Sequence, residues 1–334
     1  MLPIVECVPN FSEGRDTGVI ERIADAIRSV QGVKVLHIDS GAAANRTVIT
    51  FAGTPDEVCE AAFRASATAQ ELIDMRQHHG EHPRQGATDV LPLIPVSGIT
   101  LEECATMARN LARRMTGELG IPCYCYEAAA FRPERTNLAE CRSGEYESLP
   151  GKMADPARRP DFGPDTYNET VARSGATCVG ARNFLIAVNF NLDTTSTDIA
   201  TEIARDVRQK GRKTIVDGTP VWIPGTLRGC KAIGWYIEEY GIAQVSMNIT
   251  DIDATPLHVA FEEVCRAASA RGVKVTGTEI IGLVPKRVLT DAGRFYLNGL
   301  QADEEELIRI AIERMALDDL CPFDPRAKVL EYLL

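Results

Sequence analysis

The sequence predicts an α+β fold built from two similar halves, and three observations lead to this prediction. The chain has 334 residues, enough for about two domains, and its hydrophobic content of 45 % is ordinary for a globular protein. Apolar residues recur with a period of two in strand-like segments and near 3.6 in helix-like ones. In each half, these segments follow the order strand, helix, strand, strand, helix, strand. We therefore expect two sheets, each with helices on one face.

The first half, residues 1–178, begins with an apolar strand and contains the first such set of segments. Strands are expected at 4–8, 33–38, 46–52, 90–96 and 121–126, and helices at 17–30, 55–75 and 101–117. The stretch 131–174 is poor in apolar residues and rich in Arg, Pro and Gly. We expect it to be a long connection without strong elements, of the kind that is functional or mobile.

The second half, residues 179–334, repeats the order. Strands are expected at 183–192, 231–237, 243–249 and 273–283, helices at 197–209, 256–270, 287–297 and 304–315, and a basic loop at 211–229. Alternation in the strands predicts an uncharged polar face made of Asn189, Asn191, Gln244, Ser246 and Asn248. The matching face of the first half carries titratable groups such as Asp39. The two faces are expected to meet across a wet, ligand-sized cleft; the alternative is that the polar face meets solvent.

Charge and cysteine usage narrow the classes of partner. A formal net charge of -11 argues against nucleic acid or an acidic membrane surface, although local arginines still allow a small anionic ligand. Ten cysteines without a CxxC pair predict reduced thiols in a cytoplasmic protein. We see no secretory signal and no apolar run of bilayer length.

Histidines concentrate in one stretch, His78-His-Gly-Glu-His-Pro-Arg84, which holds three of the five in the chain. Gly80 and Pro83 argue against a continuous helix, so we expect an ordered loop after a helix. Loops that carry several titratable groups are frequent sites of chemistry. The alternative is a solvated, charged turn.

The same stretch contains His78-x-x-Glu81-His82, a pattern found in some zinc hydrolases. That chemistry requires both histidines on one helical face and a third ligand later in the chain. Gly80 and Pro83 make such a helix improbable, so we expect no metal.

An acid/base interpretation fits better, because it requires a histidine, a carboxylate to orient it and arginines for an anionic substrate. His82 supplies the imidazole. Asp39 or Glu127 supplies the carboxylate, and Arg46 or Arg84 the guanidinium. The sequence alone does not show that these side chains converge.

Several motifs together resemble one family. They are Val5-Glu-Cys-Val-Pro-Asn-Phe-Ser-Glu-Gly14, Asn45-Arg-Thr47, His78–Arg84, Gly144-Glu-Tyr-Glu147, Pro160-Asp-Phe-Gly-Pro164, Gly180-Ala-Arg182, Gln244-Val-Ser246 and Gly282-Leu-Val-Pro285. This combination is similar to the glutamate formimidoyltransferases, and equally to the formiminotransferase part of formiminotransferase-cyclodeaminase. The resemblance covers essentially the whole chain.

The resemblance implies two ferredoxin-like (βαββαβ) subdomains around a central cleft, and a homodimer. It also implies transfer of the formimino group of N-formimino-L-glutamate to N5 of tetrahydrofolate, the co-substrate, during histidine degradation. The products are 5-formiminotetrahydrofolate and L-glutamate. The family's catalytic histidine corresponds to His82, and its folate-binding segment to residues 163–175, with Gly163, Pro164 and Gly175.

Chemistry assigns further expected roles. His82 acts as general acid and base, and Asp39 binds the positively charged formimino group. Substrate contacts are expected from Arg46, Arg84 and Glu127, and pterin contacts from Asn189, Gln244, Ser246 and Asn248. Two alternatives stay open: N-formylglutamate as a formyl donor, and a folate-binding protein without turnover.

Overall fold

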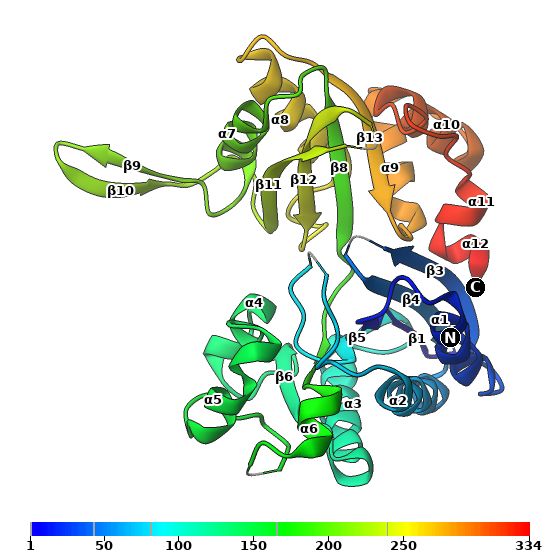
Figure 1. Cartoon of the computed structure of the whole chain (residues 1–334). Coiled ribbons are helices and arrows are strands. Elements are labelled where there is room, and N and C mark those ends of the chain that lie inside the picture. The colour runs from blue at the N-terminus through cyan, green and yellow to red at the C-terminus, as the bar shows by residue number, and fades with distance from the viewer. Residues whose placement is uncertain (1, 43, 81, 165, 239) are drawn as a thin grey trace. The chain divides into compact units, whose positions relative to one another are not determined.

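The computed structural model describes residues 2–42, 44–80, 82–164, 166–238 and 240–334 (Figure 1). Helices and sheets are both present, which confirms the predicted α+β class. Contacts within the chain divide it into a first unit, Met1–Asn183, and a second unit, Phe184–Leu334.

One mixed sheet forms the centre of the first unit. Its strands are β1 (Ile4–Cys7), β2 (Asn10–Phe11), β3 (Lys34–Gly41), β4 (Arg46–Gly53), β5 (Thr88–Ser97), β6 (Cys123–Glu127) and β7 (Thr177–Ala181). β1 and β2 together lie between β4 and β5, and β3 extends the sheet beyond β4. These pairings are antiparallel, whereas β5, β7 and β6 pair in parallel in that order.

Three long helices cover one face of this sheet: α1 (Thr17–Arg28), α2 (Pro55–Leu72) and α3 (Leu101–Arg114), which continues as a π-helical turn, Met115–Leu119. Polar side chains cap the N-termini of these helices. The Asp16 carboxylate accepts from two backbone N–H groups of α1, and Thr100 with Glu103 forms a capping box at α3. Alternate strand residues such as Phe51 and Leu93 form the core with these helices.

The described residues of the stretch 131–174 form only short elements, as expected for a connection without strong elements. They include two 3₁₀ turns, Pro133–Arg135 and Tyr146–Ser148, and the helices α4 (Leu138–Cys141), α5 (Leu149–Ala154) and α6 (Glu169–Ser174). Cys141 of α4 and Leu149 of α5 form a small second core with Val90, Tyr124 and Cys178 of the sheet. Helices of four to six residues show no amphipathic period, and packing rather than propensity stabilises them.

The strand β7 was missed, since no strand is predicted between residues 126 and 183. All five β7 residues are buried between β5 and β6. A parallel strand that is covered on both faces shows no polar–apolar alternation. The predicted boundary after residue 178 falls inside this strand, and the two units divide after Asn183.

Gly175, just before β7, allows two backbones to approach closely. Its φ is +68°, and a Cβ there would lie 2.2 Å from the Gln85 carbonyl oxygen. We expect Gly175→Ala to lower the free energy of unfolding by roughly 2–4 kcal/mol, through left-handed strain and this clash. Gly151→Ala is the matched control, since nothing lies within 4 Å of its Cβ position in α5. Urea unfolding checks the difference; equal midpoints for the two variants would contradict it.

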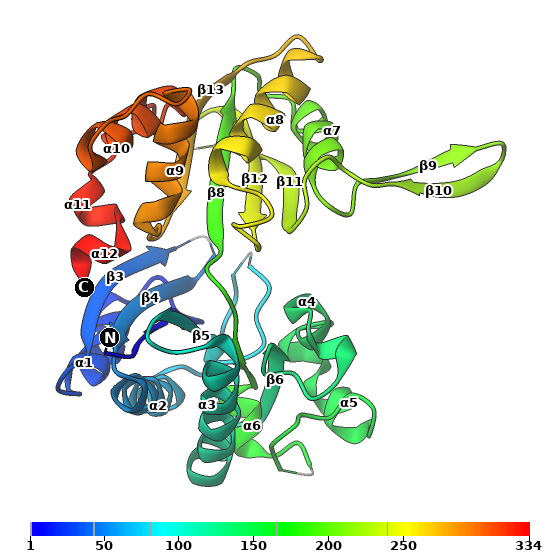
Figure 2. The ribbon, with the colours of Figure 1, turned by 180° about the vertical axis from the view of Figure 1, so that it is seen from behind.

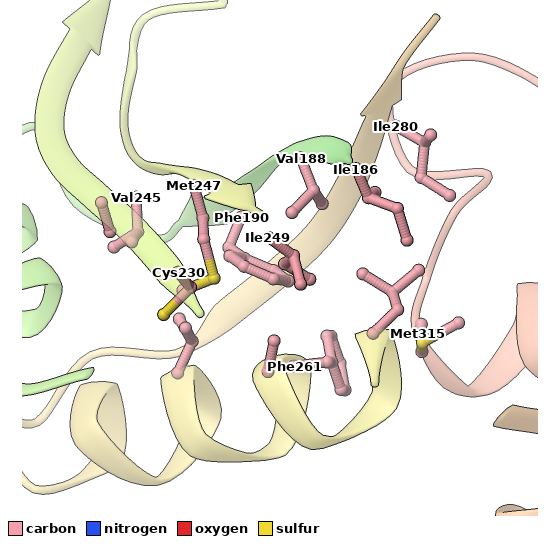
Figure 3. Packing of buried hydrophobic residues seen from close by; sticks show 14 of the residues in the cluster. Ile186, Val188, Phe190, Cys230, Val245, Met247, Ile249, Phe261, Ile280 and Met315 are labelled. Atoms are coloured by element: carbon pink, nitrogen blue, oxygen red, sulfur yellow. The ribbon is translucent and has the colours of Figure 1, made fainter. Parts of the chain in front are cut away.

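The second unit contains a four-stranded antiparallel sheet in the order β11-β12-β8-β13. The strands are β8 (Ile186–Leu192), β11 (Cys230–Ile237), β12 (Ile242–Ile249) and β13 (Val275–Ile281), and α7 (Thr197–Val207) and α8 (Leu257–Ser269) cover one face (Figure 2). The predicted inward residues of β8 and β12 are buried there against Phe261 (Figure 3). Four helices follow β13: α9 (Lys286–Tyr296), α10 (Glu304–Arg314), α11 (Pro325–Lys328) and α12 (Leu330–Leu333).

The predicted basic loop 211–229 instead contains a hairpin of β9 (Arg212–Val216) and β10 (Thr219–Ile223). It projects away from the rest of the second unit (Figure 1). Asp217 and Gly218 form its turn with φ of 49° and 76°. An Asp-Gly pair with two positive φ angles is a strong hairpin signal, and the sequence reasoning overlooked it.

All ten cysteines are free thiols, and most of them are buried. Among the described residues, no helix has the length and apolar character required to cross a bilayer.

Candidate functional site

The histidine-rich loop, residues 78–84, connects α2 to β5. The ring of His78 is buried, with Nε2 2.8 Å from the Asn45 carbonyl oxygen and Nδ1 3.4 Å from Arg84 Nε. Because the carbonyl can only accept, Nε2 donates and Nδ1 accepts from the guanidinium. Both nitrogens of His78 are therefore used within the protein. Glu81 lies outside the described residues, so the zinc-type pattern is not tested at that position.

His82 differs from His78 because its hydrogen bond leaves one nitrogen available. Its Nδ1 lies 2.7 Å from the carbonyl oxygen of Pro83. A carbonyl oxygen accepts hydrogen bonds, so Nδ1 carries the proton and Nε2 carries the lone pair. The half-buried ring is thus held in the tautomer that presents Nε2 as a base.

Three charged side chains, which we call the Asp89 cluster, lie beside this ring. The Asp89 carboxylate is fully buried, and its Oδ2 is 2.6 Å from Arg46 Nη1 and 2.9 Å from Arg142 Nη1. Its Oδ1 accepts from the backbone N–H of Gln85 at 2.8 Å. Arg142 Nη1 also donates to the Pro83 carbonyl oxygen, at 3.3 Å. His82 and the cluster therefore share one acceptor and carry a formal net charge of +1 when the imidazole is neutral.

A β-bulge explains how Asp89 comes to lie inside an apolar strand. Asn10 pairs with Val90 and the next residue, Phe11, pairs with Thr88, so Asp89 is the extra residue of β5. Bulges of this kind disrupt the ladder locally and redirect a side chain, often beside active sites. Asn10 also takes part, since its Oδ1 accepts from Arg46 Nε at 3.0 Å.

Burial lowers the pKa of His82, and the positive charges of Arg46 and Arg142 lower it further. The hydrogen bond to Pro83 and the Asp89 carboxylate act in the opposite direction. Burial also opposes ionisation of Asp89, yet the two arginines hold the pKa of its carboxyl below the usual range. The site therefore has a neutral imidazole at pH 7, ready to accept a proton.

This arrangement predicts a pH effect. Activity that needs neutral His82 rises with pH through the pKa of that ring, so a variant that raises the pKa moves the acid limb of kcat/KM to higher pH. Arg142→Met removes a positive charge and should shift the limb in this direction, whereas Arg142→Lys keeps the charge and should leave it nearly in place. A limb that stays put or moves to lower pH in Arg142→Met would rule out this electrostatic role.

The structure brings Asp39 close to Arg46. Gly41 pairs with Arg46 and Asp39 pairs with Val48, so Asp39 and Arg46 are diagonal neighbours on one sheet face. Such pairs lie roughly 7–8 Å apart. The Asp39 side chain is exposed at this edge of the sheet.

Glu127 is not brought to the same place. It ends β6 with a φ of 52°, and β6 lies at the sheet edge opposite β3. Four strand spacings separate β6 from β4, or about 19 Å. A role for Glu127 beside His82 is thus disfavoured by its strand.

Arg84 makes a bidentate ion pair within the protein. Its Nη2 is 2.6 Å from Glu147 Oε1, its Nη1 is 2.8 Å from Glu147 Oε2, and Glu145 lies 3.3 Å away. Glu147 and Glu145 therefore already pair with the Arg84 guanidinium, which was expected to bind the substrate.

The expected folate segment, 163–175, separates into two parts. Gly163 is exposed at a bend and approaches Pro160 and Pro122, and Pro164 beside it is half-buried. Gly175 instead packs against the backbone of Gln85 and Gly86, directly after the histidine-rich loop.

The polar face of the second sheet is present, but the prediction that it is uncharged is wrong. Asn189 Nδ2 donates to Glu279 Oε2 at 2.9 Å, and Asn191 Nδ2 donates to Asp319 Oδ2 at 3.1 Å. Asp319 comes from the chain after α10, where no strand pattern could reveal it.

The predicted pterin contacts on this face differ in exposure. Gln244 is fully buried and donates to Asn191 Oδ1 at 2.7 Å. Asn189 is also buried, Ser246 is half-buried and Asn248 is exposed. Gln244 is therefore committed to the protein's own network, whereas Asn248 is accessible.

Sequence reasoning missed Asp89 and Arg142 as members of the site. Asp89 had a usable signal, since a carboxylate at the start of an otherwise apolar strand requires a buried partner. Arg142 had none, because it follows the four-residue helix α4 in a stretch without periodicity.

Two family models and several curated relatives match this chain. A family model described as "Formiminotransferase domain, N-terminal subdomain" matches residues 4–182, and one described as "Formiminotransferase domain" matches residues 187–334. Glutamate formimidoyltransferase of Streptococcus pyogenes is 43% identical, over 89% of this chain and 94% of its own. The Thermoplasma acidophilum enzyme of the same name is 40% identical, over 94% and 99%.

Longer relatives also match. Formimidoyltransferase-cyclodeaminase of Gallus gallus is 46% identical over 100% of this chain. The chain spans 60% of the length of that protein. A solved microcompartment protein from Desulfitobacterium hafniense, at 10% identity and a TM-score of 0.21, supports no comparison of folds.

Proposed function

Because this chain belongs to the formiminotransferase domain family, we propose that it transfers the formimino group of N-formimino-L-glutamate to N5 of tetrahydrofolate. The family resemblance noted in the sequence motifs is thereby confirmed. The products are 5-formiminotetrahydrofolate and L-glutamate, which places the reaction in histidine degradation. Tetrahydrofolate is the co-substrate.

The observation that best supports this function is the single available nitrogen of His82. N5 of tetrahydrofolate attacks the formimino carbon, and the N5 proton passes to His82 Nε2 as the tetrahedral intermediate forms. The imidazolium then returns this proton to the glutamate nitrogen as the carbon–nitrogen bond breaks. One imidazole with a lowered pKa serves both steps, and such catalysis contributes roughly 10²–10⁴ in rate.

The Asp89 cluster supports both halves of this cycle. Its two arginines favour the neutral ring before attack, and its carboxylate limits the cost of the imidazolium that follows. The Nδ1–H bond to Pro83 keeps the ring from rotating between the two transfers.

Donor binding is assigned to neighbouring groups. Asp39 binds the positively charged formimino group, and Arg46 with Arg142 attracts the glutamate carboxylates. Arg84 is paired with Glu147 and Glu145 and has a structural role in the histidine-rich loop. Gly163, Pro164, Ser246 and Asn248 remain the accessible folate candidates, whereas Glu127, at the far edge of the first sheet, takes no part in this proposal.

A formyl donor, N-formylglutamate, is the second candidate. A neutral formyl oxygen requires hydrogen-bond donors, whereas the exposed Asp39 carboxylate favours a cation. The test offers both donors to the protein in parallel, with and without tetrahydrofolate, and measures free glutamate. We expect glutamate only from the formimino donor with tetrahydrofolate; release from neither donor would refute the enzyme, even if folate binds.

Finer structural expectations belong to the same proposal. We infer that each unit is a variant of the ferredoxin-like fold, since each contains a βαββαβ run with the fourth strand beside the first. In the first unit, β7 and β6 extend that sheet. The expected cleft between the units stays a prediction.

We also propose that the protein is a homodimer and acts in the cytoplasm. The ten unpaired thiols support the cytoplasm, where cysteines stay reduced. Light scattering after size-exclusion chromatography measures the mass, and we expect twice 36.4 kDa.

A further inference from the structure

The second sheet carries an exposed indole on the face that its helices leave open. Trp235 lies on the edge strand β11 and is 40% exposed. Its neighbour Gly234 faces the helices, where a Cβ would lie 2.1 Å from the Thr201 backbone nitrogen in α7. Side chains alternate along a strand, so the indole of Trp235 points to the opposite, open face.

A row of buried polar groups holds this indole in place. Trp235 Nε1 donates to Gln244 Oε1 at 3.0 Å, Gln244 Nε2 donates to Asn191 Oδ1 at 2.7 Å, and Asn191 Nδ2 donates to Asp319 Oδ2 at 3.1 Å. Each amide has one orientation in this row, because every acceptor already has its donor. A complete network of this kind fixes the side chain that it ends on. The indole is therefore a rigid aromatic surface open to a ligand.

A carboxylate lies at the other edge of the same face. Glu279 on β13 pairs with Asn189, and Ser246 pairs with the same asparagine from the other side. The Asn189 amide donates to Glu279 Oε2 at 2.9 Å, and no hydrogen bond or ion pair among the described residues uses Oε1. Three strand spacings separate β11 from β13, or roughly 14 Å.

We propose that this face binds the folate co-substrate lengthwise, with the p-aminobenzoyl ring stacked on Trp235 and the pterin edge hydrogen-bonded to Glu279. The inference rests on the proposed function, which supplies the ligand. A pterin presents two adjacent N–H donors, N3–H and the 2-amino group, which match the two oxygens of a carboxylate. The p-aminobenzoyl ring is a flat aromatic group of the kind that stacks on an indole. The two features of the ligand are separated along its length, as the two features of the face are separated across the sheet.

Fluorescence can test the stacking directly, because the chain has only two tryptophans. Trp222→Phe leaves Trp235 as the single indole, and Trp235→Phe leaves Trp222, which is exposed on the hairpin. We titrate each variant with folinic acid, a stable reduced folate. Saturable quenching is expected in Trp222→Phe and not in Trp235→Phe. Equal quenching in both variants, or none in Trp222→Phe while calorimetry shows binding, would overturn the stacking.

Calorimetry with ligand fragments separates the two contacts. Trp235→Ala should weaken the binding of folinic acid by about 10–100-fold, the range for stacking on one aromatic side chain. It should weaken the binding of p-aminobenzoylglutamate by a similar factor. Glu279→Gln should weaken the binding of folinic acid and of a reduced pterin, and should leave the affinity for p-aminobenzoylglutamate unchanged. Trp222→Ala is the control with no expected change. The melting temperatures of all variants should match that of the wild type within a few degrees. Trp235→Phe keeps a flat ring and should therefore bind folinic acid with most of the wild-type affinity.

The outcomes distinguish this inference from the function on which it rests. If the wild type transfers the formimino group and Trp235→Ala and Glu279→Gln bind folinic acid as tightly as the wild type, the inference is wrong and the function stands. If the wild type neither binds reduced folate nor releases glutamate, the proposed function fails and the inference fails with it.

Discussion

Replacing His82 with alanine is expected to lower kcat by about 10²–10⁴ while leaving KM for tetrahydrofolate within a few-fold. The imidazole transfers a proton in the transition state and contributes little to substrate binding in the ground state. Its Nε2 is the available nitrogen, since Nδ1 donates to the Pro83 carbonyl. Steady-state rates with both substrates varied give the two constants separately.

Two neighbours serve as controls for this result. His79→Ala removes an exposed side chain and keeps the carbonyl that accepts from Asn45 Nδ2, so kcat should change little. His78→Ala removes a buried ring and should lower stability more than it lowers kcat. A metal site would behave differently: His78→Ala and His82→Ala would both abolish activity, and a chelator would inactivate the wild type. That combination would refute the acid/base role.

Asp89→Asn is expected to lower the free energy of unfolding by about 3–5 kcal/mol, because it leaves two buried or half-buried arginines without their shared carboxylate. The asparagine can still accept from the Gln85 N–H, but its amide group opposes the guanidinium donors. Asp39→Asn makes the same chemical change at an exposed position and should stay within about 0.5 kcal/mol of the wild type. Urea unfolding at pH 7 measures both, and equal midpoints would show that Asp89 is not the centre of the cluster.

Much of the fold follows from short-range patterns. Strict alternation in β8 and β12 predicted which side chains face the apolar core, and amphipathic segments predicted α1, α3 and α7. β7 was missed because burial on both faces removes alternation, and α4 to α6 because their stability comes from contacts with distant strands. The hairpin at Asp217–Gly218 was an avoidable miss, since its turn signal is local.

For the site, too, short-range patterns predicted only some of the residues. His82 was found because histidines are rare and clustered, and Asp39 and Arg46 because adjacent strands carry them. Asp89 depends on a bulge set by the register of β2 against β5, and Arg142 on the path of a segment without periodicity. Register and path are properties of the whole fold, so a scan of neighbouring residues cannot supply them.

The most direct test of the account is the tautomer and charge of His82, measured by nitrogen-15 NMR on protein labelled at its histidines. The chain has five histidines, and comparison with His82→Ala assigns the signal. At pH 7 we predict a neutral ring with the proton on Nδ1, which titrates below the ordinary histidine value of 6.5. A proton on Nε2, or a ring that is still positively charged at pH 7, would contradict the claim that His82 Nε2 is the catalytic base.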